Sequence, residues 1–374
     1  METTLNLTYD LLIVGSGLYG AVIAYRAKQM GLRCLVLEKR AHLGGNIYQE
    51  ELEGIRIHRY GPHIFHTKNK EIWKFVCQFI DFNHFRYSPL AHYNGRFYNL
   101  PFNMHTFYQL FGTTTPEDAK KCIEQELKKE SFKKPCNLEE KAISLIGRTL
   151  YEYLIKGYTE KQWGRPANEL PSFIIERLPV RYTYDNNYFN DPYQGIPIGG
   201  YGKLISALLK GADVLLNTDF LLHRNEYETL CKRIVYTGPI DAYYKYCYGY
   251  LQYRSLRFED TLYYKENYQG CAAINETDAT VPYTRSIEHK HFEFGTQPVT
   301  IVTREFSEEW KEGAEPFYPI NNKRNTEVFN RYNILAQEEK HIIFGGRLAD
   351  YKYYDMDVVI QKALERDLNK IALP

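Results

Sequence analysis

Three glycines in G-x-G-x-x-G spacing, Gly15, Gly17 and Gly20, form the part of the sequence best suited to chemistry. They follow an apolar run that indicates a buried strand, and they precede a helical pattern. In that setting the glycines allow a tight turn and a close approach of the backbone to a diphosphate, which the N-terminus of the helix attracts. Glu38 ends the next apolar run, where its carboxylate can accept a hydrogen bond from a ribose hydroxyl. The spacing therefore predicts a dinucleotide site, for NAD or for FAD.

Two further glycine-rich segments favour FAD over NAD. The first, Leu43-Gly44-Gly45-Asn46, directly follows the second strand and offers more backbone amides to the same diphosphate. Taken alone, this segment is about equally well explained as an ordinary turn. The second, Gly345-Gly346-Arg347, lies near the C-terminus, where a flavoprotein needs another approach to its cofactor. Together the three segments predict FAD as the cofactor.

The hydrophobic patterns along the chain predict a mixed architecture. Four buried-strand patterns predict a parallel sheet, at residues 9–15, 33–38, 233–237 and 341–346. Between them lie helical patterns over 101–170 and alternating, antiparallel strand patterns over 249–306. The predicted fold class is α/β, with a discontinuous Rossmann-like FAD-binding domain, an inserted helical domain and an antiparallel β-sheet domain.

Local signals support this division of the chain. Asn94-Gly95 between two aromatic-rich runs predicts a hairpin turn, and Thr115 with Pro116 predicts the start of a helix. Asn137 with Glu140 predicts another helix start. We place the FAD-binding domain at 1–80, 195–245 and 330–374, the helical domain at 99–170, and the sheet domain at 81–98, 171–194 and 246–329.

Composition narrows the class of protein. Lys+Arg and Asp+Glu nearly balance, at 47 and 46, so we expect neither a nucleic-acid-binding nor a membrane-surface protein. The seven cysteines include no C-x-x-C pair, which predicts a reducing cytoplasm without a zinc or other metal site. The sequence shows no leader pattern and no apolar run long enough to span a membrane. Its 34 tyrosines suit a cleft for a ligand with flat and polar parts, although most single tyrosines simply pack.

Five long segments carry a resemblance to one family. They are YGPHIFHT at 60–67, IKGYTEKQWG at 155–164, IIERLPVRYTYDNNYFND at 174–191, INETDATVPYTRSIEHKHF at 274–292 and GGRLADYKYYDMD at 345–357. In these segments, and nearly end to end, the chain resembles the bacterial UDP-galactopyranose mutases. One departure concerns Leu154 and Ile155, which stand where aromatic residues that pack on uracil are expected.

The resemblance implies a function without net oxidation. Enzymes of this family interconvert UDP-galactopyranose and UDP-galactofuranose for cell-surface polysaccharide biosynthesis, by attack of reduced flavin N5 on the anomeric carbon. It further implies an external electron donor that reduces FAD, and a homodimer. The N-acetylgalactosamine forms are an open alternative as substrate, and an FAD-dependent oxidase or dehydrogenase of the same fold group is the alternative activity.

The resemblance also assigns site residues. Arginines that fork onto phosphate oxygens can stabilise a departing diphosphate, and taken alone each would be assigned to a surface ion pair. The catalytic residues implied are Arg177, Arg285 and His63. Those implied for substrate binding are Tyr158, Thr159, Trp163 on a mobile loop, Arg177, Tyr188, Asn275, Arg285, Tyr318 and Tyr353. Those implied for cofactor binding are Gly15, Gly17, Leu18, Gly20, Glu38, Lys39, Gly45, Asn46, His63, Arg347, Tyr353, Asp355, Met356 and also Asp357. Arg59 is a position at which the choice of sugar can be set.

Overall fold

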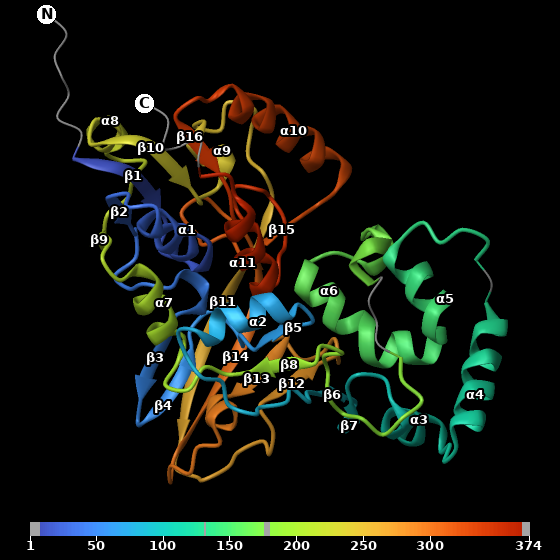
Figure 1. Ribbon diagram of the computed structural model, residues 1–374. Helices are drawn as coiled ribbons and strands as arrows, with labels where there is room; N and C mark the ends of the chain where they lie inside the picture. Colours follow the sequence, from blue (N-terminus) through green and yellow to red (C-terminus); the bar gives the residue numbers. More distant parts are fainter. Residues whose placement is uncertain (1–7, 131, 176–179, 369–374) are drawn as a thin grey trace, which may run out of the picture.

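A parallel sheet forms the upper part of the molecule in Figure 1, where the computed structural model describes residues 8–130, 132–175 and 180–368. Its strand order is β16-β10-β1-β2-β9, and all of its pairs are parallel. The strands are β1 (Tyr9–Val14), β2 (Cys34–Leu37), β9 (Asp213–Leu215), β10 (Cys231–Tyr236) and β16 (Ile342–Phe344). Because both faces of this sheet are covered, the buried stretches of its central strands, Leu11–Ile13, Cys34–Leu37 and Ile234–Tyr236, are apolar, as their sequence predicts.

Helices cover both faces of the parallel sheet. On one face, Leu11 and Ile13 pack in a core with the helices α1 (Leu18–Gln29), α2 (Lys70–Cys77), α7 (Tyr201–Leu209) and α11 (Met356–Glu365). On the other face, Leu12 packs with Phe220, Tyr236 and Tyr243. The helices on that side are α8 (Arg224–Glu228), α9 (Ile240–Tyr243) and α10 (Lys323–Glu338). This arrangement leaves the carboxyl ends of the strands open for a ligand.

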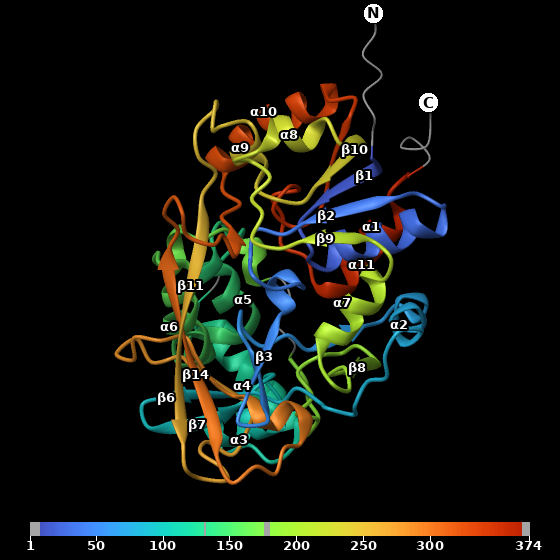
Figure 2. The ribbon, with the colours of Figure 1, turned by 90° about the vertical axis from the view of Figure 1, so that its left-hand side faces the viewer.

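A seven-stranded sheet lies below the parallel sheet in Figures 1 and 2, with the order β15-β11-β14-β13-β12-β6-β7. Its strands are β6 (Leu90–Tyr93), β7 (Arg96–Asn99), β11 (Tyr253–Tyr263), β12 (Ala273–Glu276), β13 (Arg285–Glu288), β14 (Thr300–Glu309) and β15 (Tyr318–Pro319). The pairs are antiparallel as predicted, except that β12 and β6 pair in parallel. Two small sheets complete the fold, formed by β3 (Gln49–Leu52) with β4 (Ile55–His58) and by β5 (Phe65–Thr67) with β8 (Tyr193–Gly195).

The helices α3 to α6 form a separate cluster on the right of Figure 1. They are α3 (Met104–Phe111), α4 (Pro116–Lys129), α5 (Leu138–Tyr151) and α6 (Gly157–Trp163). The predicted caps are confirmed, because the side chain of Thr115 accepts from the amide of Asp118 and that of Asn137 from the amide of Glu140. A π-helical turn, Glu152–Lys156, joins α5 to α6. Short 3₁₀ turns lie at Gly45–Ile47, Ala167–Glu169, Ser172–Ile175 and His289–Glu293.

These elements confirm the predicted fold class, whereas the exact domain boundaries stay a prediction. The hairpin predicted at Asn94-Gly95 joins β6 to β7, and both residues have positive φ angles. The helix predicted after the glycine motif ends just before Gly31, whose φ is +76°. Within the described ranges, no helix combines the length and the apolar character that crossing a bilayer requires.

Candidate active site

A cavity of about 670 Å³ lies where the parallel sheet faces the seven-stranded sheet. It runs from the glycine motif to residues of β13 and α6, so the predicted cofactor and substrate residues share one space. The predicted residues that line it are Gly15, Gly17, Leu18, Glu38, Lys39, Gly45, Asn46, His63, Tyr158, Tyr188, Asn275, Arg285, Arg347, Tyr353, Asp355 and Met356.

Other predicted residues stand outside the lining. Gly20, Thr159, Trp163, Tyr318, Asp357 and Arg59 do not line the cavity, and Arg177 lies outside the described residues. Asp357 accepts a hydrogen bond of 2.8 Å from the hydroxyl of Thr67, so its role is to hold β5 against α11. Tyr318 supports the lining indirectly, since its ring centroid lies 5.9 Å from that of Tyr353.

The glycine motif forms a cradle that side chains would fill. Gly15 has a φ of +102°, and a Cβ on it would collide with the hydroxyl of Thr237. A Cβ on Gly45 would stand 3.0 Å from the Cα of Gly17, so the two glycine segments touch backbone to backbone. Gly20 does not reach the cavity because its position is needed for packing beneath the turn, as expected for the third glycine of this motif.

The N-terminus of α1 is suited to bind an anion. Its N-cap is Gly17, which has no side chain to accept from the first helical amides, and the first turn contains no acidic residue. The positive end of the helix dipole is therefore available to a diphosphate. Beside it, the buried carboxylate of Glu38 accepts from the amide and the hydroxyl of Ser16, at 3.0 and 2.7 Å, and from the amide of Arg40 at 3.0 Å.

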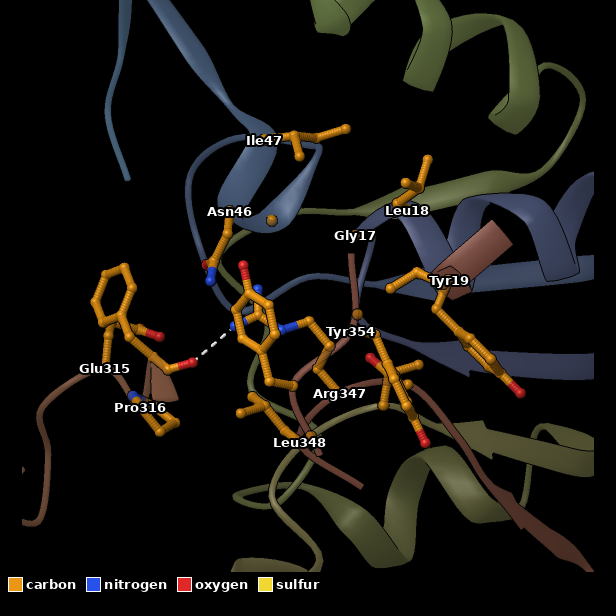
Figure 3. A pocket seen from close by; sticks show the side chains of 18 of the residues that line it. Gly17, Leu18, Tyr19, Asn46, Ile47, Glu315, Pro316, Arg347, Leu348 and Tyr354 are labelled. Atoms are coloured by element: carbon orange, nitrogen blue, oxygen red, sulfur yellow. Dashed lines mark hydrogen bonds between the residues drawn. The ribbon is translucent and has the colours of Figure 1, made fainter. Parts of the chain in front are cut away.

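A polar cluster faces the start of α1 across the cavity (Figure 3). Arg40 donates to Glu315 at 2.7 Å and to the side-chain oxygen of Asn46 at 3.2 Å. Lys39 forms a second ion pair with Glu315 at 2.9 Å. Glu315 therefore fixes two cations at this end, and its pKa is lowered because they outweigh the effect of its burial.

These observations fit FAD. The glycine cradle and the uncapped helix suit a diphosphate, and Glu38 stands where a ribose lies in such a motif. Arg347 donates to the carbonyl of Phe317 at 2.8 Å, while its buried Nε has no partner among the described residues. A cofactor that supplies an acceptor would satisfy this nitrogen.

His63 is held as a neutral ring. Its Nδ1 lies 2.8 Å from the carbonyl of Gly61, and its amide donates to Nδ1 of His58 at 3.1 Å. Burial lowers the pKa of His63 to about 4, and the charges of Arg347 and Arg285 act in the same direction. At neutral pH the ring therefore donates through Nδ1 to the carbonyl.

Arg285 is the charged group at the other end of the cavity. Its Nη2 lies 3.0 Å from Glu305, whose carboxylate is fully buried and also accepts from the hydroxyl of Thr284 at 3.2 Å. Burial opposes the charge of Arg285, but Glu305 and the neighbouring tyrosines together outweigh burial, so the pKa of the guanidinium is raised. Its buried Nε has no partner in the described part of the chain, so one donor stays available to an anion.

Tyrosines surround this guanidinium. Tyr158 and Tyr188, two of the residues assigned to the substrate, line the cavity, and burial raises the pKa of both hydroxyls, so they stay neutral and can donate. Tyr87 was missed by the sequence-based assignment, although it lines the cavity and packs 5.6 Å from Tyr188. Glu305 was missed as well. The sequence gives one weak signal for Glu305, which is that a charged residue stands in the mostly buried half of a strand pattern.

The prediction that Trp163 lies on a loop needs correction. Trp163 is the last residue of α6, not part of a loop, because Gly164 ends the helix in a left-handed conformation with a φ of +64°. The helix is fastened to the sheet by Lys161, which donates to the carbonyls of Asp278, Val281 and Tyr283 at 2.8–3.1 Å. Arg59 does not line the cavity and pairs with Glu50 and Asp260, and its part in the choice of sugar stays a prediction.

Comparisons with known proteins find relatives among the nucleotide-sugar mutases. A family model described as UDP-galactopyranose mutase matches residues 153–353, and one described as NAD(P)-binding Rossmann-like domain matches residues 13–79. A probable UDP-galactopyranose mutase of Klebsiella pneumoniae is 39% identical over 361 residues, which cover 95% of this chain and 93% of that protein. A dTDP-fucopyranose mutase of Escherichia coli is 38% identical over 364 residues, which cover 95% and 96%.

A solved structure supports the same fold. The crystal structure of reduced UDP-galactopyranose mutase matches with a TM-score of 0.71 and 14% sequence identity, over 98% of each chain. At that identity the match shows the fold alone. The family is shown by the family model and by the long alignments with relatives that are 38% and 39% identical: the chain belongs to the UDP-galactopyranose mutase family.

Proposed function

We propose that this chain is an FAD-dependent isomerase that interconverts UDP-galactopyranose and UDP-galactofuranose. The observation that carries the proposal is that one cavity holds two places for a diphosphate. The glycine cradle with the start of α1 suits the diphosphate of FAD, and Arg285 with its tyrosines suits that of a nucleotide sugar. A sugar between the two would face the flavin.

Residues in different parts of the cavity would bind different ligands. Gly15, Gly17, Gly45 and the helix α1 would hold the cofactor diphosphate, with Glu38 on a ribose. When bound and reduced, FAD supplies the nucleophile that carries the sugar while the nucleotide is detached. Residues of this chain bind and orient both ligands around that step.

Arg285 would stabilise the departing nucleotide. Its free Nε can donate to a phosphate oxygen, while Glu305 holds the rest of the guanidinium in place. We propose Arg177 as a second guanidinium for the same diphosphate and Asn275 as a contact toward the nucleotide. The hydroxyls of Tyr158 and Tyr188 would donate to the diphosphate without adding charge, since burial keeps them protonated.

The test is turnover by chemically reduced, anaerobic enzyme. Reduced enzyme should convert UDP-galactofuranose to UDP-galactopyranose, seen by chromatography, whereas the oxidised enzyme should not. An oxidised sugar product with stoichiometric flavin reduction would instead support the oxidase or dehydrogenase alternative. UDP-N-acetylgalactosamine and dTDP-fucopyranose belong in the same assay, because the choice of sugar and base is part of the proposal and a relative is named for the latter.

Further parts of the proposal rest on the family resemblance. We propose an external electron donor that reduces FAD, a homodimer, a place in the cytoplasm and a role in cell-surface polysaccharide biosynthesis. Sedimentation of the holoenzyme tests the dimer. Flavin reduction by cell extract under anaerobic conditions tests the donor.

A further inference from the structure

His66 and Asp191 form a pair in the cavity to which the assigned roles above give no function. Nδ1 of His66 lies 2.6 Å from a carboxylate oxygen of Asp191, and the His66 side chain is only 16% exposed. Its ring stacks on Phe189 with centroids 3.7 Å apart and planes at 14°. His66 and Phe189 both line the cavity. The ring is thus fixed by one hydrogen-bonding carboxylate and one aromatic face.

The pair belongs to the substrate end of the cavity. The ring of Phe189 lies 5.5 Å from that of Tyr188 and 5.7 Å from that of Tyr87. Tyr87 in turn contacts Arg285, whose charge lowers the pKa of the tyrosine against the larger effect of burial. A continuous line of rings therefore leads from His66 to the guanidinium that would bind the nucleotide.

The contact with Asp191 also fixes the tautomer of His66. A carboxylate accepts, so Nδ1 carries the hydrogen, and Nε2 is the nitrogen that can take a proton from a ligand. Among the described residues, Nε2 has no hydrogen-bond partner. A histidine that is oriented by a carboxylate and lines a ligand cavity, with its other nitrogen without a partner among the described residues, has the arrangement of a general acid–base catalyst.

The proposed reaction needs such a group. Exchange of the two ring forms breaks the bond between C1 and O5 and makes the bond between C1 and O4. The electron pair of the broken bond goes to O5, which gains a proton, and O4 gives a lone pair to C1 and loses its proton. One proton therefore moves from O4 to O5, with no oxidant or reductant consumed in this exchange.

Arg285, the neighbouring tyrosines and His63 are poorly suited to carry that proton. Arg285 stays charged, and burial keeps the hydroxyls of Tyr87, Tyr158 and Tyr188 protonated. The Nδ1 of His63 is held by a carbonyl, and the low pKa of its ring makes it a weak base.

We propose that His66, oriented by Asp191, carries the proton between the O4 and O5 atoms of the sugar during ring exchange. This inference rests on the proposed function. His66 is then a catalytic residue, and Asp191 is a positioning residue that acts through it. The sequence offers a matched control in His84, which is exposed and stacks on Phe294 at 4.7 Å but does not line the cavity.

The experiment separates detachment of UDP from ring exchange. UDP-galactopyranose with ¹⁸O in the bridge between C1 and phosphate reports reversible detachment by positional exchange, and product chromatography reports ring exchange. His66→Asn keeps a donor for Asp191 and removes Nε2. With reduced holoenzyme, His66→Asn should lower ring exchange by about 100-fold or more while positional exchange and UDP binding stay within about twofold. His84→Asn should leave both rates unchanged.

Asp191→Asn tests the positioning role. It should lower ring exchange less than His66→Asn does, again without loss of positional exchange or of bound FAD seen by its absorbance. Equal loss of both rates in His66→Asn would show a merely structural role and overturn the proposal, as would unchanged ring exchange. If the wild-type enzyme shows neither rate with any nucleotide sugar, the proposed function itself has failed, which is a different outcome.

Discussion

Replacement of Gly20 by alanine is the sharpest test of the cofactor cradle. Gly20 lies in the first turn of α1, and a Cβ there would stand 2.1 Å from the carbonyl oxygen of Gly15 and 3.1 Å from Ile13. A backbone oxygen cannot rotate away as a side chain can, so the turn at Gly15 must move. Forced overpacking of this kind costs about 1–3 kcal/mol. The higher helix propensity of alanine offsets at most about 1 kcal/mol of this cost.

The turn that must move is the turn that would hold the diphosphate, so FAD affinity should fall together with stability. A loss of about 1.4 kcal/mol at the cradle corresponds to about tenfold in the dissociation constant. Gly202 is the matched control, because it also lies in a first turn, in α7, and a Cβ on it would meet no atom within 4 Å. Gly202→Ala should stabilise the chain by up to about 1 kcal/mol and leave FAD binding unchanged.

Urea unfolding of the FAD-free variants and titration with FAD measure the two effects separately. Gly20→Ala should unfold at lower urea than the wild type and bind FAD at least about tenfold more weakly. The reasoning is refuted if Gly20→Ala binds FAD like the wild type, or if both alanine variants shift stability in the same direction.

Three further predictions concern charged and titratable groups. Arg285→Lys keeps the charge beside Glu305 but loses the fork, so turnover should fall about 100-fold with FAD still bound, as absorbance and product assays can check. Burial lowers the pKa of His289 to about 3, so below the ordinary value of 6.5 the unfolded chain takes up a proton that the folded chain does not. Stability should therefore fall as pH drops from 6.5 towards 3, and His289→Gln should reduce that slope by up to about 1.4 kcal/mol per pH unit in urea unfolding. Lys161→Met removes three charge-assisted hydrogen bonds between α6 and the 278–283 loop and should cost about 1.5–3 kcal/mol, and calorimetry that finds no change in the melting temperature would contradict it.

Much of the fold was predictable because it depends on interactions between residues that are close in sequence. The glycine motif, the apolar parallel strands and the caps at Thr115 and Asn137 each depend on residues within a few positions of one another. Most of the site residues that the glycine motif and the resemblance assigned line the cavity, because the long segments carry residues that converge there. These features needed no knowledge of which strand lies beside which.

Contacts between distant segments were not predictable in the same way. Arg285 meets Glu305 because β13 and β14 pair in one particular register, and β12 pairs with β6 across a separation of 184 residues, as at Glu276 and His92. Likewise His66 meets Asp191 only once the chain has folded. Neither propensity nor periodicity specifies such register, so Glu305 and Tyr87 were missed.

The π-helical turn Glu152–Lys156 sets the rotational phase of α6. Each residue turns a helix by about 100°, and a π turn accommodates an extra one without breaking the chain of hydrogen bonds. Tyr158 and Lys161 are three positions apart and therefore lie on one face of α6. With the observed rotation of the helix, Tyr158 lines the cavity and Lys161 reaches the carbonyl of Asp278. Deleting a single residue from the turn would restore regular winding and swing that face aside by about 100°. The segment should therefore tolerate many substitutions but no change of length.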